Sequence, residues 1–165
     1  MQPTDLLSLL AELCIGYAGF LAIFLIFARR EGKFSPADGV RVRAIIFCSF
    51  FTIFASLVPL LLTFAVSETP DLWRLSSASA AGAWVPIIAS VGREQYALPL
   101  EHRAEVGRTN HFVAWGLVVL SVLLLVGNAI GLFGDPAAFP YLCVVAFGLG
   151  PPTSNFVTLA IHRLL

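Results

Sequence analysis

The sequence predicts an all-α membrane protein, a bundle of five transmembrane helices with the N-terminus outside and the C-terminus in the cytoplasm. Three observations support this prediction. The chain of 165 residues is 58% hydrophobic and only 12% charged, whereas a soluble domain carries about 25% charged residues. Five apolar runs each reach the roughly 20 residues that cross a bilayer as a helix. The basic residues fall almost entirely on alternate connections between these runs, as expected where cytoplasmic loops concentrate Lys and Arg.

The five runs are expected to form a single domain over residues 1–165, with spans at residues 5–28, 44–66, 72–92, 112–133 and 138–162. Helices are favoured because the runs are continuously apolar, whereas the strands of a membrane barrel alternate over about 10 residues. The third run, LWRLSSASAAGAWVPIIASVG, is the least apolar, so the distribution of charge decides whether it crosses. If it crosses, nine of the ten basic residues face the cytoplasm and only Arg74 lies outside; if it does not, the ten divide evenly.

The connections between the spans carry residues that begin helices. Ser35, Pro36 and Asp38 form a capping-box pattern, which starts the second helix in the cytoplasm before the membrane. A capping residue followed by proline recurs at residues 69–70 and 135–136. Short outer turns therefore join the second span to the third, and the fourth to the fifth, as antiparallel hairpins. Residues 94–107 are long and polar enough for one extra cytoplasmic element.

Several segments carry a resemblance to a known group of proteins. They are AELCIGYAGF (residues 11–20), ARREGKFSPADGVRVRAII (28–46), SLVPLLL (56–62), LWRLSS (72–77) and NFVTLAIHRLL (155–165). With these segments the chain resembles a family of small, functionally uncharacterised bacterial multi-pass membrane proteins. The resemblance implies a location in the bacterial inner (cytoplasmic) membrane and no assigned activity. The sequence GLGPPTS, residues 148–154, departs from that family pattern.

The first candidate site is a polar cluster in the outer half of the bundle. Glu12 lies about seven residues from the outer end of the first span, or roughly 10 Å along a helix. Asn128 lies at a similar depth in the fourth span, and the third span supplies three serines: Ser76, Ser77 and Ser79. We expect a Glu12–Asn128 hydrogen bond with serine support, and Arg74 as a charge partner at the outer rim. Such a cluster either binds a proton or cation or joins helices, at about 0.6–2 kcal/mol.

The second candidate site is a break in the fifth span. Two consecutive prolines remove two backbone donors and crowd the preceding turn, so we expect the helix to kink or break near residues 147–148. The residues involved are Gly148, Gly150, Pro151, Pro152 and Asn155. Carbonyls freed inside a membrane can bind ions in transporters. The alternative is a tolerated kink whose carbonyls are satisfied locally by Thr153, Ser154 and Asn155.

Small residues mark the faces on which helices can approach closely. They are Gly16 with Gly19, the run at residues 76–83, and Gly127 with Gly131 in a G-x-x-x-G spacing. The spacing does not distinguish contacts within one chain from contacts between chains.

The basic cluster of the first cytoplasmic connection can bind anionic lipid headgroups at about 1 kcal/mol per residue. It consists of Arg29, Arg30, Lys33, Arg41 and Arg43, and membrane orientation alone also accounts for it.

Three histidines are expected on the cytoplasmic side: His102, His111 and His162. The last two begin and end neighbouring spans, which invites a haem or metal site, with interfacial anchoring as the alternative. The cysteines are expected to pack as apolar residues within spans: Cys14, Cys48 and Cys143. No metal site and no cofactor are predicted.

These features favour a non-enzymatic integral membrane protein, a self-associating or accessory (scaffold) subunit. Its expected partners are the lipid bilayer and either further copies of itself or a larger membrane complex, with no nucleic acid. The alternative is a small oligomeric transporter or channel that uses Glu12, Asn128 and the broken fifth helix. A membrane enzyme ranks third, because the acidic, histidine and cysteine residues are scattered over both faces.

Overall fold

The chain folds into helices throughout the region that the structure describes. The computed structural model describes residues 3–30, 35–66, 70–105, 108–134 and 137–164; within these ranges the side chains of residues 3–4, 21–30, 70, 103–105, 108–111 and 159–164 lie outside the description. The helices are α1 (Pro3–Arg30), α2 (Pro36–Leu62), α3 (Pro70–Ala97), α4 (Leu100–Glu105), α5 (Arg108–Ala129), α6 (Ala138–Phe147) and α7 (Gly150–Leu164). These ranges contain no β-strand, so the prediction of an all-α protein is confirmed.

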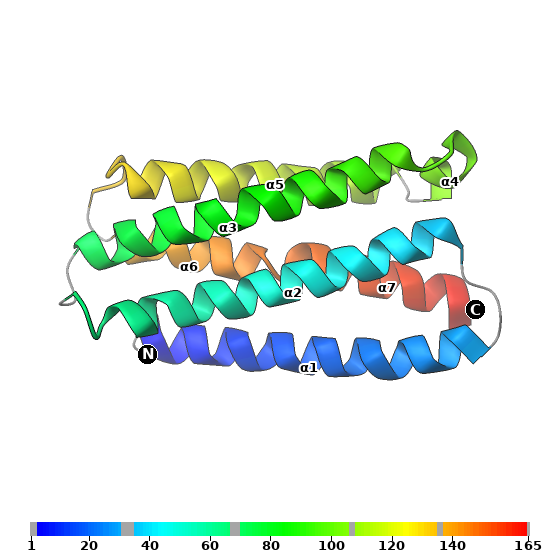
Figure 1. Ribbon diagram of the computed structural model, residues 1–165, viewed down its shortest axis with the longest axis horizontal. Helices are drawn as coiled ribbons and strands as arrows, with labels where there is room; N and C mark the ends of the chain where they lie inside the picture. Colours follow the sequence, from blue (N-terminus) through cyan, green and yellow to red (C-terminus); the bar gives the residue numbers. More distant parts are fainter. Residues whose placement is uncertain (1–2, 31–34, 67–69, 106–107, 135–136, 165) are drawn as a thin grey trace.

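The long helices lie side by side in an elongated bundle (Figure 1). α1, α3 and the α6–α7 pair run in one direction, and α2 and α5 run in the other. α1 packs against α2 and α6, whereas α5 packs against α3, α6 and α7. α1 and α5 therefore form opposite edges of the bundle, with α2, α3, α6 and α7 between them (Figure 1).

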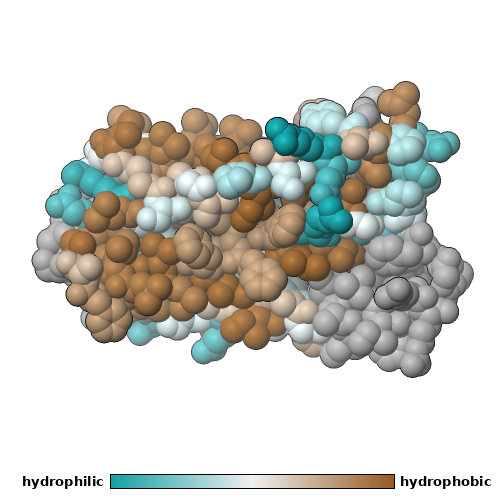
Figure 2. Space-filling view, in the orientation of Figure 1, coloured by the Kyte–Doolittle hydropathy of each residue, from teal (hydrophilic) through white to brown (hydrophobic). Residues whose placement is uncertain are grey.

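Three helices within the described residues are long and apolar enough to cross a membrane: Pro36–Leu62, Asp71–Ala97 and Phe112–Ala129. They correspond to the second, third and fourth expected spans, and they include the weakly apolar third run. Hydrophobic residues cover much of the visible face of the bundle, and hydrophilic residues gather at its left end and over its right-hand part (Figure 2). Such a surface is typical of a membrane protein.

The helix ends follow local sequence signals. The capping box at the start of α2 is confirmed, since the Ser35 hydroxyl accepts from the Asp38 amide at 3.3 Å and the Asp38 carboxylate accepts from the Ser35 amide at 3.0 Å. α3 ends at Ala97, five residues beyond the predicted end of the third span, because Pro99 disfavours the helical conformation at Leu98. The short helix α4 then forms the extra element expected in residues 94–107.

Buried aromatic side chains hold the middle of the bundle together. Phe51 of α2 stacks on Trp84 of α3, with ring centroids 4.0 Å apart and an interplanar angle of 23°. Tyr141 of α6 is fully buried, packs against Trp73, and donates its hydroxyl to the Ala55 carbonyl. Such an aromatic pair adds about 0.5–1.5 kcal/mol beyond its area burial. These contacts fix α2, α3 and α6 relative to one another.

Candidate functional site

Asn128 is buried near the C-terminal end of α5, with only 1% of its surface exposed. Its amide nitrogen donates to the Ser77 hydroxyl at 2.8 Å and to the Ala137 carbonyl at 2.9 Å. These bonds connect α5 to α3 and to the residue just before α6. Both protons of the amide nitrogen are therefore used inside the chain, and Asn128 joins three segments of the bundle.

The turn after α5 brings Ala137 back to Asn128. Gly131 has a φ of +77°, and the Leu132 amide donates to the Gly127 carbonyl at 2.8 Å, so the helix ends in a Schellman-type turn. A Cβ on Gly127 would come within 2.8 Å of the Phe133 ring. The Gly127–Gly131 spacing was expected to mark a contact between helices; instead it ends α5, because the second glycine supplies the left-handed conformation of the turn.

The other members of the expected outer cluster have local partners. The Ser76 hydroxyl is buried and donates to the Leu72 carbonyl within α3, whereas Ser79 is exposed. Arg74 forms an ion pair with Asp71 at 3.6 Å, and its guanidinium lies against Gly131. Its Nε is buried and has no hydrogen-bond partner among the described residues. Arg74 thus belongs to the contact between α3 and the turn after α5.

Glu12 lies on the outer face of α1, and the expected hydrogen bond to Asn128 is not formed. Glu12 is exposed, and the amide nitrogen of Asn128 is bonded to Ser77 and Ala137 instead. The two helices lie on opposite edges of the bundle (Figure 1). Asn128 lies beside Ala137, before α6, whereas Glu12 lies near the break after α6, so the two residues differ in level as well as in direction around the helix axis.

The direction of Glu12 follows from the apolar pattern of α1. The face toward the bundle carries Leu7, Leu10 and Cys14, all buried. Glu12 points away from that face into an open groove of about 580 Å³. The groove is lined by Leu9, Glu12, Leu13, Gly16, Tyr17, Phe20 and Phe156; we call it the α1 groove. No hydrogen bond or ion pair joins Glu12 to any other described side chain, so its carboxyl group stands alone among mainly apolar neighbours.

The level of Glu12 along the bundle is that of the helix break. Cys14, two residues further along α1, bonds through its thiol to the side chain of Thr52 in α2. The hydroxyl of Thr52 in turn approaches Gly148 so closely that a Cβ there would lie 2.5 Å from it. Only glycine fits at residue 148, and this contact holds the break against α2.

The fifth run contains two helices rather than one, since α6 ends at Phe147 and α7 begins at Gly150. Pro151 and Pro152 occupy the first turn of α7, where a helix does not need their missing amide protons. The Thr153 hydroxyl donates to the Leu149 carbonyl at 2.7 Å, and the Asn155 amide to the Pro151 carbonyl at 2.8 Å. The side chains of the break therefore bond to its own backbone carbonyls, as expected for the tolerated kink that is the alternative to an ion site.

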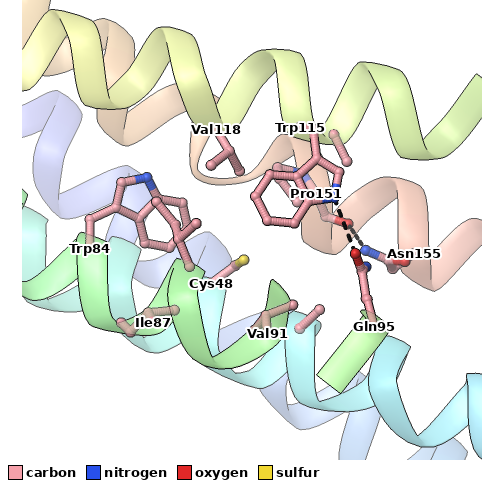
Figure 3. A pocket seen from close by; sticks show the side chains of 12 residues that line it. Cys48, Trp84, Ile87, Val91, Gln95, Trp115, Val118, Pro151 and Asn155 are labelled. Carbon is pink, nitrogen blue, oxygen red and sulfur yellow. Dashed lines mark hydrogen bonds between the residues drawn. The ribbon is translucent and has the colours of Figure 1, made fainter. Parts of the chain in front are cut away.

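A small cavity of about 50 Å³ lies between α2, α3, α5 and α7 (Figure 3). Its wall includes Cys48, Trp84 and Asn155, and at one side Trp115 donates its indole N–H to the Gln95 amide oxygen at 3.1 Å (Figure 3). The volume is sufficient for a few water molecules. Gln95 and Trp115 were not among the predicted site residues; the signal that could have found them is a neutral amide that directly follows Arg93 and Glu94 near the end of α3.

The five basic residues of the first connection divide between ion pairs and side chains that the structure does not describe. Arg41 is buried and pairs with Asp38 at 3.0 Å, with side-chain exposures of 4% and 2%. Its expected role in binding lipid headgroups is therefore corrected, because a buried, paired guanidinium does not reach a headgroup. Arg43 is exposed and pairs with Glu94 of α3. The side chains of the remaining three lie outside the description: Arg29, Arg30 and Lys33.

The described histidine, cysteine and acidic side chains do not come together as a metal site. Within the described residues there is no group of three or more His, Cys, Asp and Glu side chains that could hold a metal ion. His102 lies 4.0 Å from Glu101, and the side chains of His111 and His162 lie outside the description. All three cysteines are free.

No protein-family model, curated protein or solved structure matches this chain. The function proposed below therefore rests on the sequence and on the geometry described above.

Proposed function

We propose that this protein is a multi-pass membrane protein of the bacterial inner membrane with five spans, formed by α1, α2, α3, α5 and the α6–α7 pair. Its N-terminus lies outside and its C-terminus in the cytoplasm. The antiparallel arrangement supports this topology: Arg43 at the start of α2 pairs with Glu94 near the end of α3, whereas Arg74 lies near the opposite end of α3. Cytoplasmic ends concentrate basic residues. The family resemblance supports the choice of membrane.

Within that membrane the protein acts as a non-enzymatic subunit that assembles with another membrane component through the outer face of α1. The single observation that carries this proposal is the position of Glu12 in the α1 groove. An acidic side chain inside a transmembrane helix costs up to about 3 kcal/mol on the insertion scale, and such residues almost always face a bundle interior or a water-filled cavity. In this chain the carboxyl group faces away from the bundle. Burial against a partner removes it from lipid.

The same face of α1 has room for another helix. Gly16 and Gly19 are exposed, and a Cβ on either would meet nothing within 4 Å. Both lie on the side of α1 that carries Glu12, at helical spacings of four and seven residues. Small residues on an open face let a second backbone approach closely and gain van der Waals contact.

The test compares two glycine substitutions in the full-length protein. Gly16→Leu fills the α1 groove and is expected to shift the protein, extracted in mild detergent, from a larger complex to its monomer size. Gly116→Leu is the matched control, since Gly116 is exposed on α5 at the opposite edge and also has nothing within 4 Å. Size-exclusion chromatography with light scattering, and identification of co-purified proteins, measures the difference. Equal sizes for both variants and the wild type would reject assembly through α1.

A small oligomeric transporter or channel remains the second candidate, supported by the cavity beside the start of α7 and by Asn155 in its wall. A transporter or channel of this kind should conduct protons or cations in proteoliposomes, and Glu12→Gln should abolish that flux. Flux of this kind without any stable complex would favour the transporter over the subunit.

A further inference from the structure

We infer that the partner in the α1 groove is a transmembrane helix of a different protein that carries a lysine or arginine near its middle and forms an ion pair with Glu12. This inference rests on the proposed function and names the chemistry of its partner. It starts from one carboxyl group that the chain exposes at the level of the helix break.

The side chains that the structure describes offer Glu12 no cation. Of the basic residues whose side chains the structure describes, Arg41 and Arg43 pair with acids at the other end of the bundle. Arg74 lies in α3, four residues after the start of that helix, against Gly131 and Asp71. Arg93 lies near the end of α3. None of these side chains lies on α1, and the two on α2, Arg41 and Arg43, lie in its first two turns, away from Thr52, which faces Cys14 of α1.

A second copy of this chain is also poorly matched to Glu12. A two-fold axis along the membrane normal brings identical residues together, so a dimer through α1 sets Glu12 against Glu12. The exposed side chains in the central parts of the other long helices are apolar; they are Phe50, Phe54, Val85, Pro86, Val119 and Leu120. Ser79 is the exposed hydroxyl nearest to them on α3, and a hydroxyl does not neutralise a carboxylate.

The shape of the α1 groove fits a helix with a long side chain. Gly16 supplies the low floor, while Leu13, Phe20 and Phe156 form apolar walls around the carboxyl group. Tyr17 is held in place, since its hydroxyl bonds to the Thr153 hydroxyl oxygen at 3.0 Å and its ring packs edge-on against Phe156. The stem of a lysine or arginine can lie along these walls with its charged head at Glu12.

The experiment uses synthetic transmembrane peptides as probes. The purified full-length protein, labelled with a donor dye, is placed in phosphatidylethanolamine–phosphatidylglycerol vesicles with an acceptor-labelled leucine–alanine helix that carries one central lysine. The matched peptide has leucine at that position. A central lysine keeps the same depth in either orientation of the peptide. Energy transfer at increasing peptide-to-lipid ratio gives the relative affinities.

We expect the lysine peptide to bind about tenfold more tightly than the leucine peptide, the range that an interhelical polar contact in a membrane supplies. Glu12→Gln is expected to abolish this preference. Because Glu12 is exposed, the variant should retain the helicity and monomer size of the wild type, and both are measured. Gln95→Leu, in the cavity wall, serves as the unrelated control and is expected to keep the preference.

Three outcomes would overturn the inference. One is equal binding of the two peptides to the wild-type protein, and another is a lysine preference that survives in Glu12→Gln. The third is self-association of the labelled protein that Glu12→Gln or Ser79→Ala abolishes, which would identify a second copy as the occupant. If Gly16→Leu dissolves the native complex while the peptides bind equally, assembly through α1 stands and only the cationic partner is rejected.

Discussion

Asn128 and Glu12 are both polar residues in helices that are otherwise apolar, yet the bundle treats them in opposite ways. Asn128 is buried and donates both amide protons to groups of the same chain. Glu12 is exposed in the α1 groove, without a hydrogen bond or ion pair to any other described side chain. The difference separates two uses of polarity in a membrane protein. A satisfied group such as Asn128 holds one chain together, whereas an exposed group such as Glu12 needs a partner from outside.

The largest expected effect concerns Asp38, which, like Asn128, is buried and bonded within the chain. Asp38→Ala removes the buried partner of Arg41 and one half of the capping box of α2. Leaving a buried guanidinium without its carboxylate costs about 3–5 kcal/mol. The free energy of unfolding in mixed micelles, followed by helicity during titration with a denaturing detergent, measures this loss.

The matched control is Glu94→Ala, which removes the partner of Arg43 in a pair that is partly open to solvent. Such exposed pairs contribute less than about 1 kcal/mol. Equal losses of unfolding free energy for Asp38→Ala and Glu94→Ala would show that a buried ion pair stabilises this protein no more than an exposed one.

A smaller effect tests the packing behind α1, on the side that Glu12 avoids. Gly148→Ala places a Cβ against the Thr52 hydroxyl, and overpacking of this kind costs about 1–3 kcal/mol. Adding Thr52→Ala removes the clashing oxygen, so the double variant should recover part of the loss. The unfolding free energies of the two single variants and the double variant give this coupling.

Gly116→Ala is the control for Gly148→Ala, because a Cβ at Gly116 meets nothing within 4 Å. There the substitution is expected to leave the protein unchanged or to stabilise the helix by up to about 1 kcal/mol. A loss at residue 116 equal to that at residue 148 would mean that Gly148 is not held against Thr52.

The sequence predicts the elements of the fold better than it predicts their contacts. Apolar runs and helix-starting residues are local, so the helices, the capping box at Ser35 and the interruption near Gly148 can be predicted one segment at a time. The end of α3 was placed five residues early, because Arg93 and Glu94 end the apolar run without ending the helix.

The candidate site could be predicted only in part, because contacts between helices depend on rotation about the helix axis and on which helices are neighbours. The buried apolar face of α1, with Leu7 and Cys14, directs Glu12 outward. The prediction used the depth of Glu12 and Asn128 alone and so placed them together. The role of Gly131 was missed for a similar reason, since its spacing from Gly127 fits both a helix interface and a helix end.

We expect that Asn128 stabilises the bundle and that Glu12, at the opposite edge, does not. The most direct test of this central claim is a double-mutant cycle between Glu12→Gln and Asn128→Asp. Asn128→Asp replaces the donor of two hydrogen bonds by an oxygen beside the Ala137 carbonyl and is expected to cost about 2–3 kcal/mol of unfolding free energy. Glu12→Gln is expected to change it by less than about 0.5 kcal/mol, as for other exposed positions. The account predicts that the two changes add within about 0.5 kcal/mol. A coupling above about 1 kcal/mol would contradict it, because residues on opposite edges of the bundle share no contact through which to interact.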